Sequence, residues 1–110
     1  MVNIKILVLS TISIFASTGS AADCYGKNPK ASIDAAWAAR QAYCGNNLWK
    51  NTATFALNGV QIVNTSPGSN TQQVCWDAFE NIINQCRKNG KFNLGLYEYG
   101  DAEYNMSWGG

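Results

Sequence analysis

Few residues of this chain are suited to catalysis. The 110-residue sequence contains 7 acidic residues and no histidine. Hydrolytic and nuclease chemistry at neutral pH usually depends on a histidine or on a carboxylate with a tuned partner. Glu98 and Glu103 could approach each other as the two carboxylates of a glycosidase do, but carboxylates that flank a turn are more often solvated charges. We therefore predict no catalytic residue and no cofactor.

The four cysteines have two chemical uses, metal coordination and disulfide formation. They are Cys24, Cys44, Cys75 and Cys86. Metal coordination is disfavoured, because no CxxC spacing occurs and no histidine is present to complete a zinc site. An even number of cysteines in a short secreted domain is typical of a disulfide framework. We expect two disulfides that compensate for a small core, and no stable metal.

The N-terminal residues predict secretion. One basic residue precedes an apolar run over residues 6–15, and small residues follow up to Ala22. This order is typical of a signal peptide over residues 1–22 with cleavage after Ala22. The alternative, a membrane anchor, is disfavoured because the run is too short to span a bilayer. We expect one extracellular, disulfide-stabilised domain over residues 23–110.

Two segments have the pattern of helices. Residues 32–44 are rich in alanine and begin with Ser32, a good N-cap. Residues 73–90 repeat apolar side chains at intervals of three and four, after a capping box formed by Ser69 and Gln72. Between these helices, Asn58–Gly59 is a strong signal for a type I′ hairpin turn.

The sequence predicts the pairing within both hairpins. The first turn places Leu57 opposite Val60 and Phe55 opposite Ile62. The second hairpin, centred on residues 99–101, permits a two-residue turn, which separates the leucines of one strand from the apolar residues of the other. A three-residue loop gathers all of the apolar side chains on one face: Phe92, Leu94, Leu96, Tyr104, Met106 and Trp108. We predict the three-residue loop, because the hydrophobic pattern normally sets the register.

The order of elements predicts the disulfide pairing. Cys75 and Cys86 lie 11 positions apart on one predicted helix, a separation of roughly 16 Å, whereas a disulfide needs Cα atoms about 4.4 to 6.8 Å apart. Helix, hairpin, helix and hairpin in this order predict an α+β fold with two helices on one face of an antiparallel sheet. The end of the first helix then lies near the start of the second. We predict the pairs Cys24–Cys86 and Cys44–Cys75.

Four aromatic residues have no evident core role and are candidates for partner binding: Trp49, Trp76, Tyr97 and Tyr99. We expect Tyr97 and Tyr99 on the sheet face opposite the helices, where aromatic rings could stack on sugars or anchor a protein. Simple packing over the open side of the sheet explains them equally well.

Two further sequence features bear on partners. Asn64 and Asn105 begin sequons that permit N-glycosylation, and Pro67 disfavours the first. The 8 basic residues nearly balance the 7 acidic ones, for a net charge of +1. We therefore expect no general attraction to nucleic acid or anionic lipid.

The element order resembles that of small secreted cysteine-rich effectors of fungi. The residues that carry it are an alanine-rich helix ending in YCG and the segment NTSPGSNTQQVCWDAFENIINQC before a closing hairpin. The arrangement is similar to the α/β-sandwich killer toxins of smut fungi and to related necrosis-inducing effectors of plant pathogens. The resemblance extends over nearly all of the chain after the predicted signal peptide.

This resemblance implies a virulence effector or a killer-toxin-like antimicrobial protein that acts by binding. Its target would be a protein, glycan or membrane component of a host or a competing microbe. The alternative is a secreted glycan-binding protein of the cell wall that uses Tyr97, Tyr99 or Trp76 as a stacking platform. A third function, a small secreted hydrolase or ribonuclease, needs a catalytic residue that we do not find.

Overall fold

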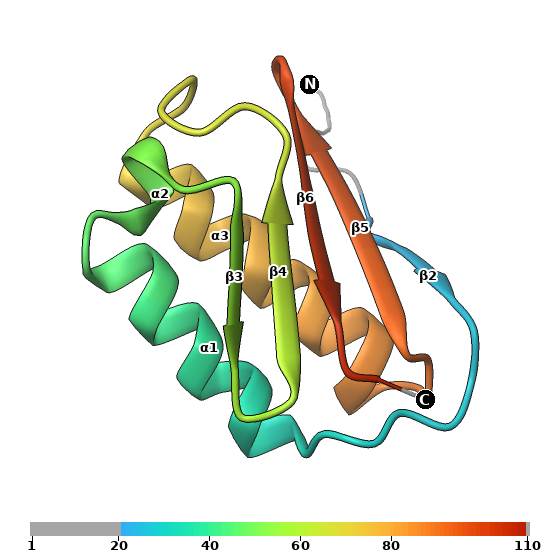
Figure 1. Cartoon of the computed structure of the whole chain (residues 1–110). Helices are drawn as coiled ribbons and strands as arrows, with labels where there is room; N and C mark the ends of the chain where they lie inside the picture. Colours follow the sequence, from blue (N-terminus) through green and yellow to red (C-terminus); the bar gives the residue numbers. More distant parts are fainter. Residues whose placement is uncertain (1–20, 110) are drawn as a thin grey trace, which may run out of the picture.

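The strands form one antiparallel sheet, and the helices cover one of its faces, in the computed structural model, which describes residues 21–109 (Figure 1). The strands are β2 (Asp23–Tyr25), β3 (Thr54–Leu57), β4 (Val60–Asn64), β5 (Leu94–Tyr99) and β6 (Ala102–Ser107). Their order in the sheet is β2-β5-β6-β4-β3. The helices are α1 (Ile33–Gly45), α2 (Leu48–Asn51), α3 (Gln72–Ile83) and a π-helical turn, η2 (Asn84–Lys88), which continues α3. The predicted α+β class is confirmed.

Capping hydrogen bonds explain where the two long helices begin. The backbone N–H of Ala35 donates to Oγ of Ser32 at 3.1 Å, so Ser32 caps α1 as predicted. The capping residue of α3 is Thr71, whose Oγ1 accepts from the N–H of Val74. The capping box predicted at Ser69 is wrong, because its hydroxyl donates to the carbonyl oxygen of Ser66 in the preceding turn.

The first hairpin has the predicted register. Phe55 pairs with Ile62 and Leu57 with Val60. Asn58 and Gly59 have φ values of 51° and 84°, as a type I′ turn requires. An Asn–Gly turn therefore sets which residues of β3 and β4 face the helices.

The predicted register of the second hairpin is wrong. Tyr99 pairs with Ala102 and Tyr97 with Tyr104, so the loop contains two residues rather than three. Leu94 and Leu96 consequently lie on the face away from the helices. The residues of β5 that face the helices are Gly95, Tyr97 and Tyr99.

Gly95 explains this register. A Cβ atom at Gly95 would lie 2.5 Å from Cγ2 of Ile82 and 2.9 Å from Sγ of Cys86. Helix α3 and its π-helical continuation therefore approach the backbone of β5 more closely than any side chain allows. Glycine has no side chain, so it does not count as an apolar residue in a hydrophobic pattern. The pattern therefore indicated the wrong face of β5.

Both predicted disulfides are present. Cys24 is bonded to Cys86 with a Cα separation of 5.4 Å, and Cys44 is bonded to Cys75 with a Cα separation of 5.7 Å. The first bond ties edge strand β2 to the end of the α3–η2 helix. The second ties the end of α1 to the start of α3, so each bridge supports one end of the helical layer.

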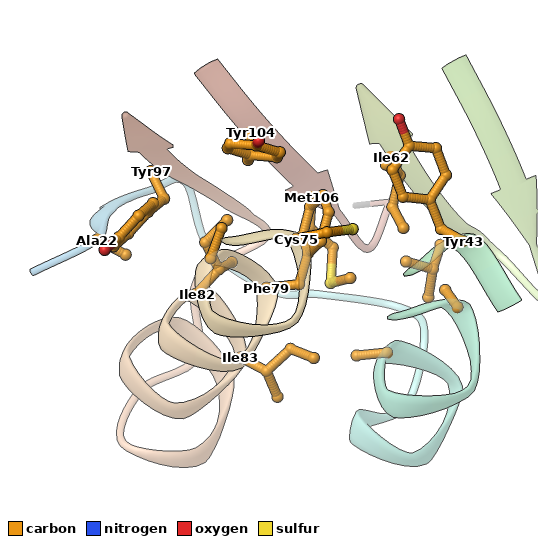
Figure 2. Close-up of a cluster of buried hydrophobic side chains, with 14 of the residues drawn as sticks. Ala22, Tyr43, Ile62, Cys75, Phe79, Ile82, Ile83, Tyr97, Tyr104 and Met106 are labelled. Atoms are coloured by element: carbon orange, nitrogen blue, oxygen red, sulfur yellow. The ribbon is translucent and has the colours of Figure 1, made fainter. Parts of the chain in front are cut away.

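The core lies between the sheet and the two long helices (Figure 2). Tyr43 of α1 contacts Phe79 of α3 edge-to-face with ring centroids 5.9 Å apart, and Phe79 contacts Tyr104 of β6 at 5.6 Å. The aliphatic side chains of Ile62 and Ile82 are fully buried beside them. Among the described helices, none has the length and apolar character needed to cross a membrane.

Candidate functional site

Tyr97 and Tyr99 lie on the face of β5 that the helices cover. Our expectation that they lie on the open face is wrong, because the register of β5 and β6 differs from the predicted one by one residue. Tyr97 is only 8% exposed and joins the core, whereas Tyr99 is 50% exposed at the end of the strand. The ring of Tyr97 therefore lies in the core, and the ring of Tyr99 lies at the surface.

These tyrosines line a small hollow between α3 and β5. Its lining residues are Val74, Asp77, Tyr97 and Tyr99, and its volume is about 80 Å³. An exposed aromatic ring, an aliphatic side chain and a carboxylate therefore converge at one place. Small-molecule sites typically combine an apolar wall with a few well-placed polar groups.

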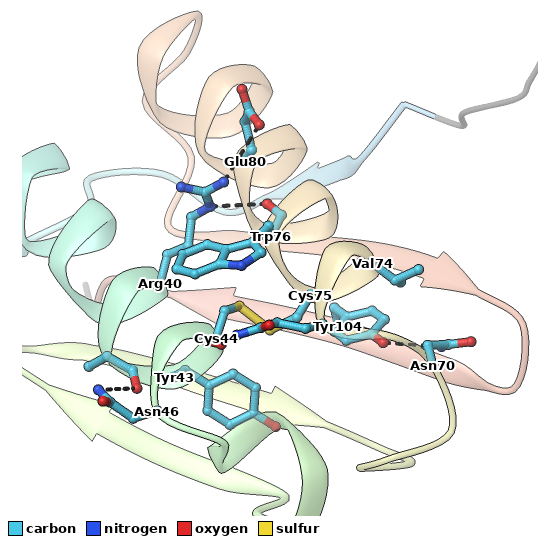
Figure 3. The surroundings of a disulfide bond; sticks show 12 residues. Arg40, Tyr43, Cys44, Asn46, Asn70, Val74, Cys75, Trp76, Glu80 and Tyr104 are labelled. Carbon is cyan, nitrogen blue, oxygen red and sulfur yellow. Dashed lines mark hydrogen bonds and ion pairs between the residues drawn. A yellow bond between two sulfur atoms is a disulfide. The ribbon is translucent and has the colours of Figure 1, made fainter.

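Neighbouring amides hold this hollow in shape. Asn70 donates one hydrogen bond to the carbonyl oxygen of Tyr99 at 3.0 Å and another to the hydroxyl of Tyr104 at 3.1 Å, the second of which is drawn in Figure 3. Gln73 donates to Oδ1 of Asp77 at 2.9 Å. Among the described residues, no hydrogen bond reaches the other carboxylate oxygen of Asp77, so that oxygen can accept one from a ligand.

The hydroxyl of Tyr97 stays protonated over a wide pH range. Burial raises the pKa of Tyr97, and the negative charge of Asp77 raises it further. A neutral hydroxyl can both donate and accept a hydrogen bond. The hollow therefore offers a donor as well as the carboxylate acceptor.

Trp76 and Trp49 lie elsewhere and contact cations of this chain. The guanidinium of Arg40 lies 4.7 Å from the ring centroid of Trp76, and its Nε donates to the carbonyl oxygen of that residue (Figure 3). Arg40 also forms an ion pair with Glu80 at 3.6 Å. The ammonium of Lys50 lies 5.4 Å from the ring centroid of Trp49. Because these rings already carry a cation, Tyr99 is the better stacking surface.

A protein-family model described as alpha-galactosyl binding lectin matches residues 31–108. The chain belongs to this family. A search of curated proteins finds no match. Membership of a lectin family supports a binding role and not a catalytic one. It is consistent with a small cysteine-rich protein, but it does not support the specific killer-toxin-like family that the element order suggested.

The remaining predicted positions do not contribute to the hollow of this lectin-family domain. Asn64 is 1% exposed, and its Oδ1 accepts from the N–H of Ser66, so a glycan on Asn64 would have no space in the folded domain. Asn105 lies half-buried in β6 on the open face, where glycosylation stays a prediction. Glu98 and Glu103 face each other across the second hairpin as register partners. Within residues 21–109, no cluster of three or more potential ligands is placed to hold a metal ion.

Sequence reasoning missed Asp77, Asn70 and Gln73. Polar side chains near the start of a helix are ordinarily solvated, so their residue types give no sign of a site. Their grouping with Tyr99 depends on the β5 register and on the docking of α3. The position of Gly95 was the one signal in the sequence that could have revealed it.

Proposed function

We propose that this protein is a secreted lectin that binds terminal α-galactosyl groups in the hollow between α3 and β5. One observation carries the proposal: the half-exposed ring of Tyr99 adjoins the carboxylate of Asp77 in a member of an α-galactosyl-binding lectin family. The glycan-binding alternative is thus better supported than an effector that recognises protein or membrane. Two disulfides in a small domain are consistent with an extracellular location.

The chemistry of galactose fits this pair of residues. The axial hydroxyl of galactose leaves one face of the ring covered by C–H groups, and such a face stacks on an aromatic side chain. In this binding mode the apolar face of the sugar lies on Tyr99. The hydroxyls at the edge of the sugar donate to the free carboxylate oxygen of Asp77, while the hydroxyl of Tyr97 supplies a donor at the inner wall.

The small volume limits the ligand to a terminal residue. A hollow of about 80 Å³ encloses only part of one sugar ring, so most of a longer glycan would remain in solvent. Shallow sites of this kind immobilise few groups and gain little buried area. We expect a single-site Kd of about 1 mM, with stronger apparent binding on surfaces that display many galactosyl groups.

Isothermal titration with methyl α-galactoside and methyl α-glucoside tests this proposal. Tyr99→Ala should weaken galactoside binding at least about tenfold, which corresponds to about 1.4 kcal/mol. Tyr25→Ala is the matched control, because Tyr25 is 49% exposed but pairs with Leu94, at the opposite end of β5 from Tyr99. Equal losses in both variants, or equal affinity for the two sugars, would reject the site.

A role as an effector or antimicrobial toxin is the second candidate, supported by the disulfide framework and the element order. Galactosyl groups on a host or a competing microbe would then be the attachment point. Growth assays with the wild-type protein and the Tyr99→Ala variant separate the two functions. Inhibition by both proteins would indicate a toxic activity that does not depend on sugar binding.

A further inference from the structure

A second, larger hollow lies at the opposite end of the sheet from Tyr99. It has a volume of about 600 Å³ and is lined by Asn28, Pro29, Arg87, Lys88, Gly90 and Lys91. One wall is the segment between β2 and α1, and the other is the end of η2 with the loop that leads to β5 (Figure 1). Three lining residues are cations and none is acidic.

Backbone contacts hold the two walls together. The N–H of Asn93 donates to the carbonyl oxygen of Tyr25 at 3.1 Å and links the two walls, while the N–H of Phe92 donates to the carbonyl oxygen of Cys86 at 3.2 Å within the second wall. The Cys24–Cys86 disulfide joins the same two segments. The backbone segments that carry these cations are therefore held by hydrogen bonds and a disulfide. Such restraint lowers the entropy cost of binding a ligand there.

The cations at this end lack acidic partners. Three cations line the hollow, and Lys27 and Lys30 flank the lining residues Asn28 and Pro29 in the sequence. Within the described part of the chain, the one ion pair is that of Arg40 with Glu80, at a different site. The dipole of a helix C-terminus favours cations such as Arg87 and Lys88. It does not account for Lys91, which lies beyond the helix.

Arg87 is held in a fixed position at the edge of this hollow. Its Nη1 donates to the carbonyl oxygen of Ala31 at 2.8 Å, and its guanidinium lies 5.2 Å from the ring centroid of Trp108. Partial burial lowers the pKa of Arg87, so a nearby anion would stabilise its charged form. A guanidinium has five N–H donors in a planar fork, and this geometry matches sulfate and phosphate oxygens.

We propose that this hollow binds the sulfate or phosphate group of an anionic saccharide. A single oxyanion is much smaller than about 600 Å³, so the group would belong to a larger molecule, and a sugar ring fits a hollow of this size class. A membrane surface is a poorer match, because Pro29 is the one apolar side chain in the lining and the neighbouring Phe92 is only 36% exposed, whereas membrane-binding faces insert several apolar residues beside their cations. This site is independent of the galactosyl site.

Binding to immobilised dextran sulfate and to unsulfated dextran, at low and high salt, tests the proposal. Wild-type protein should bind only the sulfated polymer, and salt should weaken the binding. Lys88→Gln with Lys91→Gln should reduce affinity at least about tenfold, since both side chains are exposed cations of the lining. Lys50→Gln is the matched control, because Lys50 is also an exposed lysine but lies on α2.

Each outcome decides between this site and its alternatives. An equal loss in Lys50→Gln would indicate a general charge effect and overturn the site. Binding to phosphatidylserine vesicles without binding to dextran sulfate would assign the cations to a membrane. In a parallel titration, the Lys88/Lys91 variant should retain wild-type affinity for methyl α-galactoside, and Tyr99→Ala should retain affinity for dextran sulfate. Because each variant should lose affinity for only one of the two ligands, the failure of one proposed site can be told apart from the failure of the other.

Discussion

The two ends of strand β5 present opposite chemistry. Near Tyr99, the hollow contains an aromatic ring and a carboxylate. A third hollow, of about 220 Å³, lies at the same turn and is lined by Glu98, Asp101 and Glu103, among others. Near the start of β5, the hollow is lined by three cations and contains no aromatic residue. The overall charge of +1 conceals this separation, because charges far apart on the surface act locally once solvent screens them.

Each end also has its own disulfide, and removing a disulfide should produce the largest effect. Cys44→Ser with Cys75→Ser should lower the free energy of unfolding by about 3 to 4 kcal/mol and should impair galactoside binding, because Cys75 adjoins Val74. Cys24→Ser with Cys86→Ser should destabilise the domain similarly but impair sulfate binding, because Cys86 adjoins Arg87.

Urea unfolding gives the two stabilities, and binding assays at low temperature on the folded fraction give the two affinities. If both variants lose both ligands equally, the ends are not independent, and the proposed division of roles is wrong.

Gly95→Ala should have the next largest effect and tests how α3 is positioned. The added methyl group would meet Ile82 and Cys86, and overpacking of this kind costs about 1 to 3 kcal/mol. Ser107→Ala, on the open face of β6, is a control that should change stability little. A Gly95→Ala variant with wild-type stability would show that α3 lies farther from the sheet.

Asp77→Asn should remove the negative charge from the hollow near Tyr99 without changing the size of the side chain. Loss of the negative charge removes a charge-assisted hydrogen bond, so galactoside affinity should fall about tenfold by calorimetry. Glu80→Gln, at the exposed position one turn later on α3, is the control and should not alter binding. Unchanged affinity in Asp77→Asn would remove Asp77 from the site.

Alkaline pH should destabilise the domain through its buried tyrosines. Burial raises the pKa of Tyr43, Tyr97 and Tyr104. In the unfolded chain these hydroxyls ionise near about pH 10, while the folded state keeps them neutral, so the free energy of unfolding should fall as the pH rises above about 10. Urea unfolding at successive pH values measures this, and Tyr97→Phe should reduce the slope. A constant stability from pH 9 to pH 11 would contradict it.

The smallest effect is expected away from both ends, at the Arg40–Glu80 ion pair. Glu80 is 52% exposed, and ion pairs of this kind contribute about 0.2 to 1 kcal/mol. Glu80→Gln should therefore shift the urea midpoint only slightly. A loss above about 2 kcal/mol would mean that the stack of Arg40 on Trp76 depends on this carboxylate.

The sequence predicted those features that depend on local chemistry. Asn58–Gly59 determined the first hairpin through its positive φ values, and helix length excluded a Cys75–Cys86 bond. The register of the second hairpin, between β5 and β6, depended on the close approach of Ile82 to Gly95. Only tertiary packing creates this approach.

The candidate sites were hard to predict for the same reason. Tyr99 and Asp77 were separately visible as an aromatic residue and a carboxylate, but their meeting follows from the register of β5. Likewise, Lys27 and Lys91 are distant in sequence, and the Cys24–Cys86 bond brings their segments together.

Titration of the isotope-labelled protein with methyl α-galactoside, followed by NMR, tests the central claim most directly. The proposed site predicts shift changes in Val74, Asp77, Tyr97 and Tyr99, and none in Asn28 or in residues 87–91. Changes confined to the cationic hollow, or changes identical to those with methyl α-glucoside, would contradict the proposed galactosyl site.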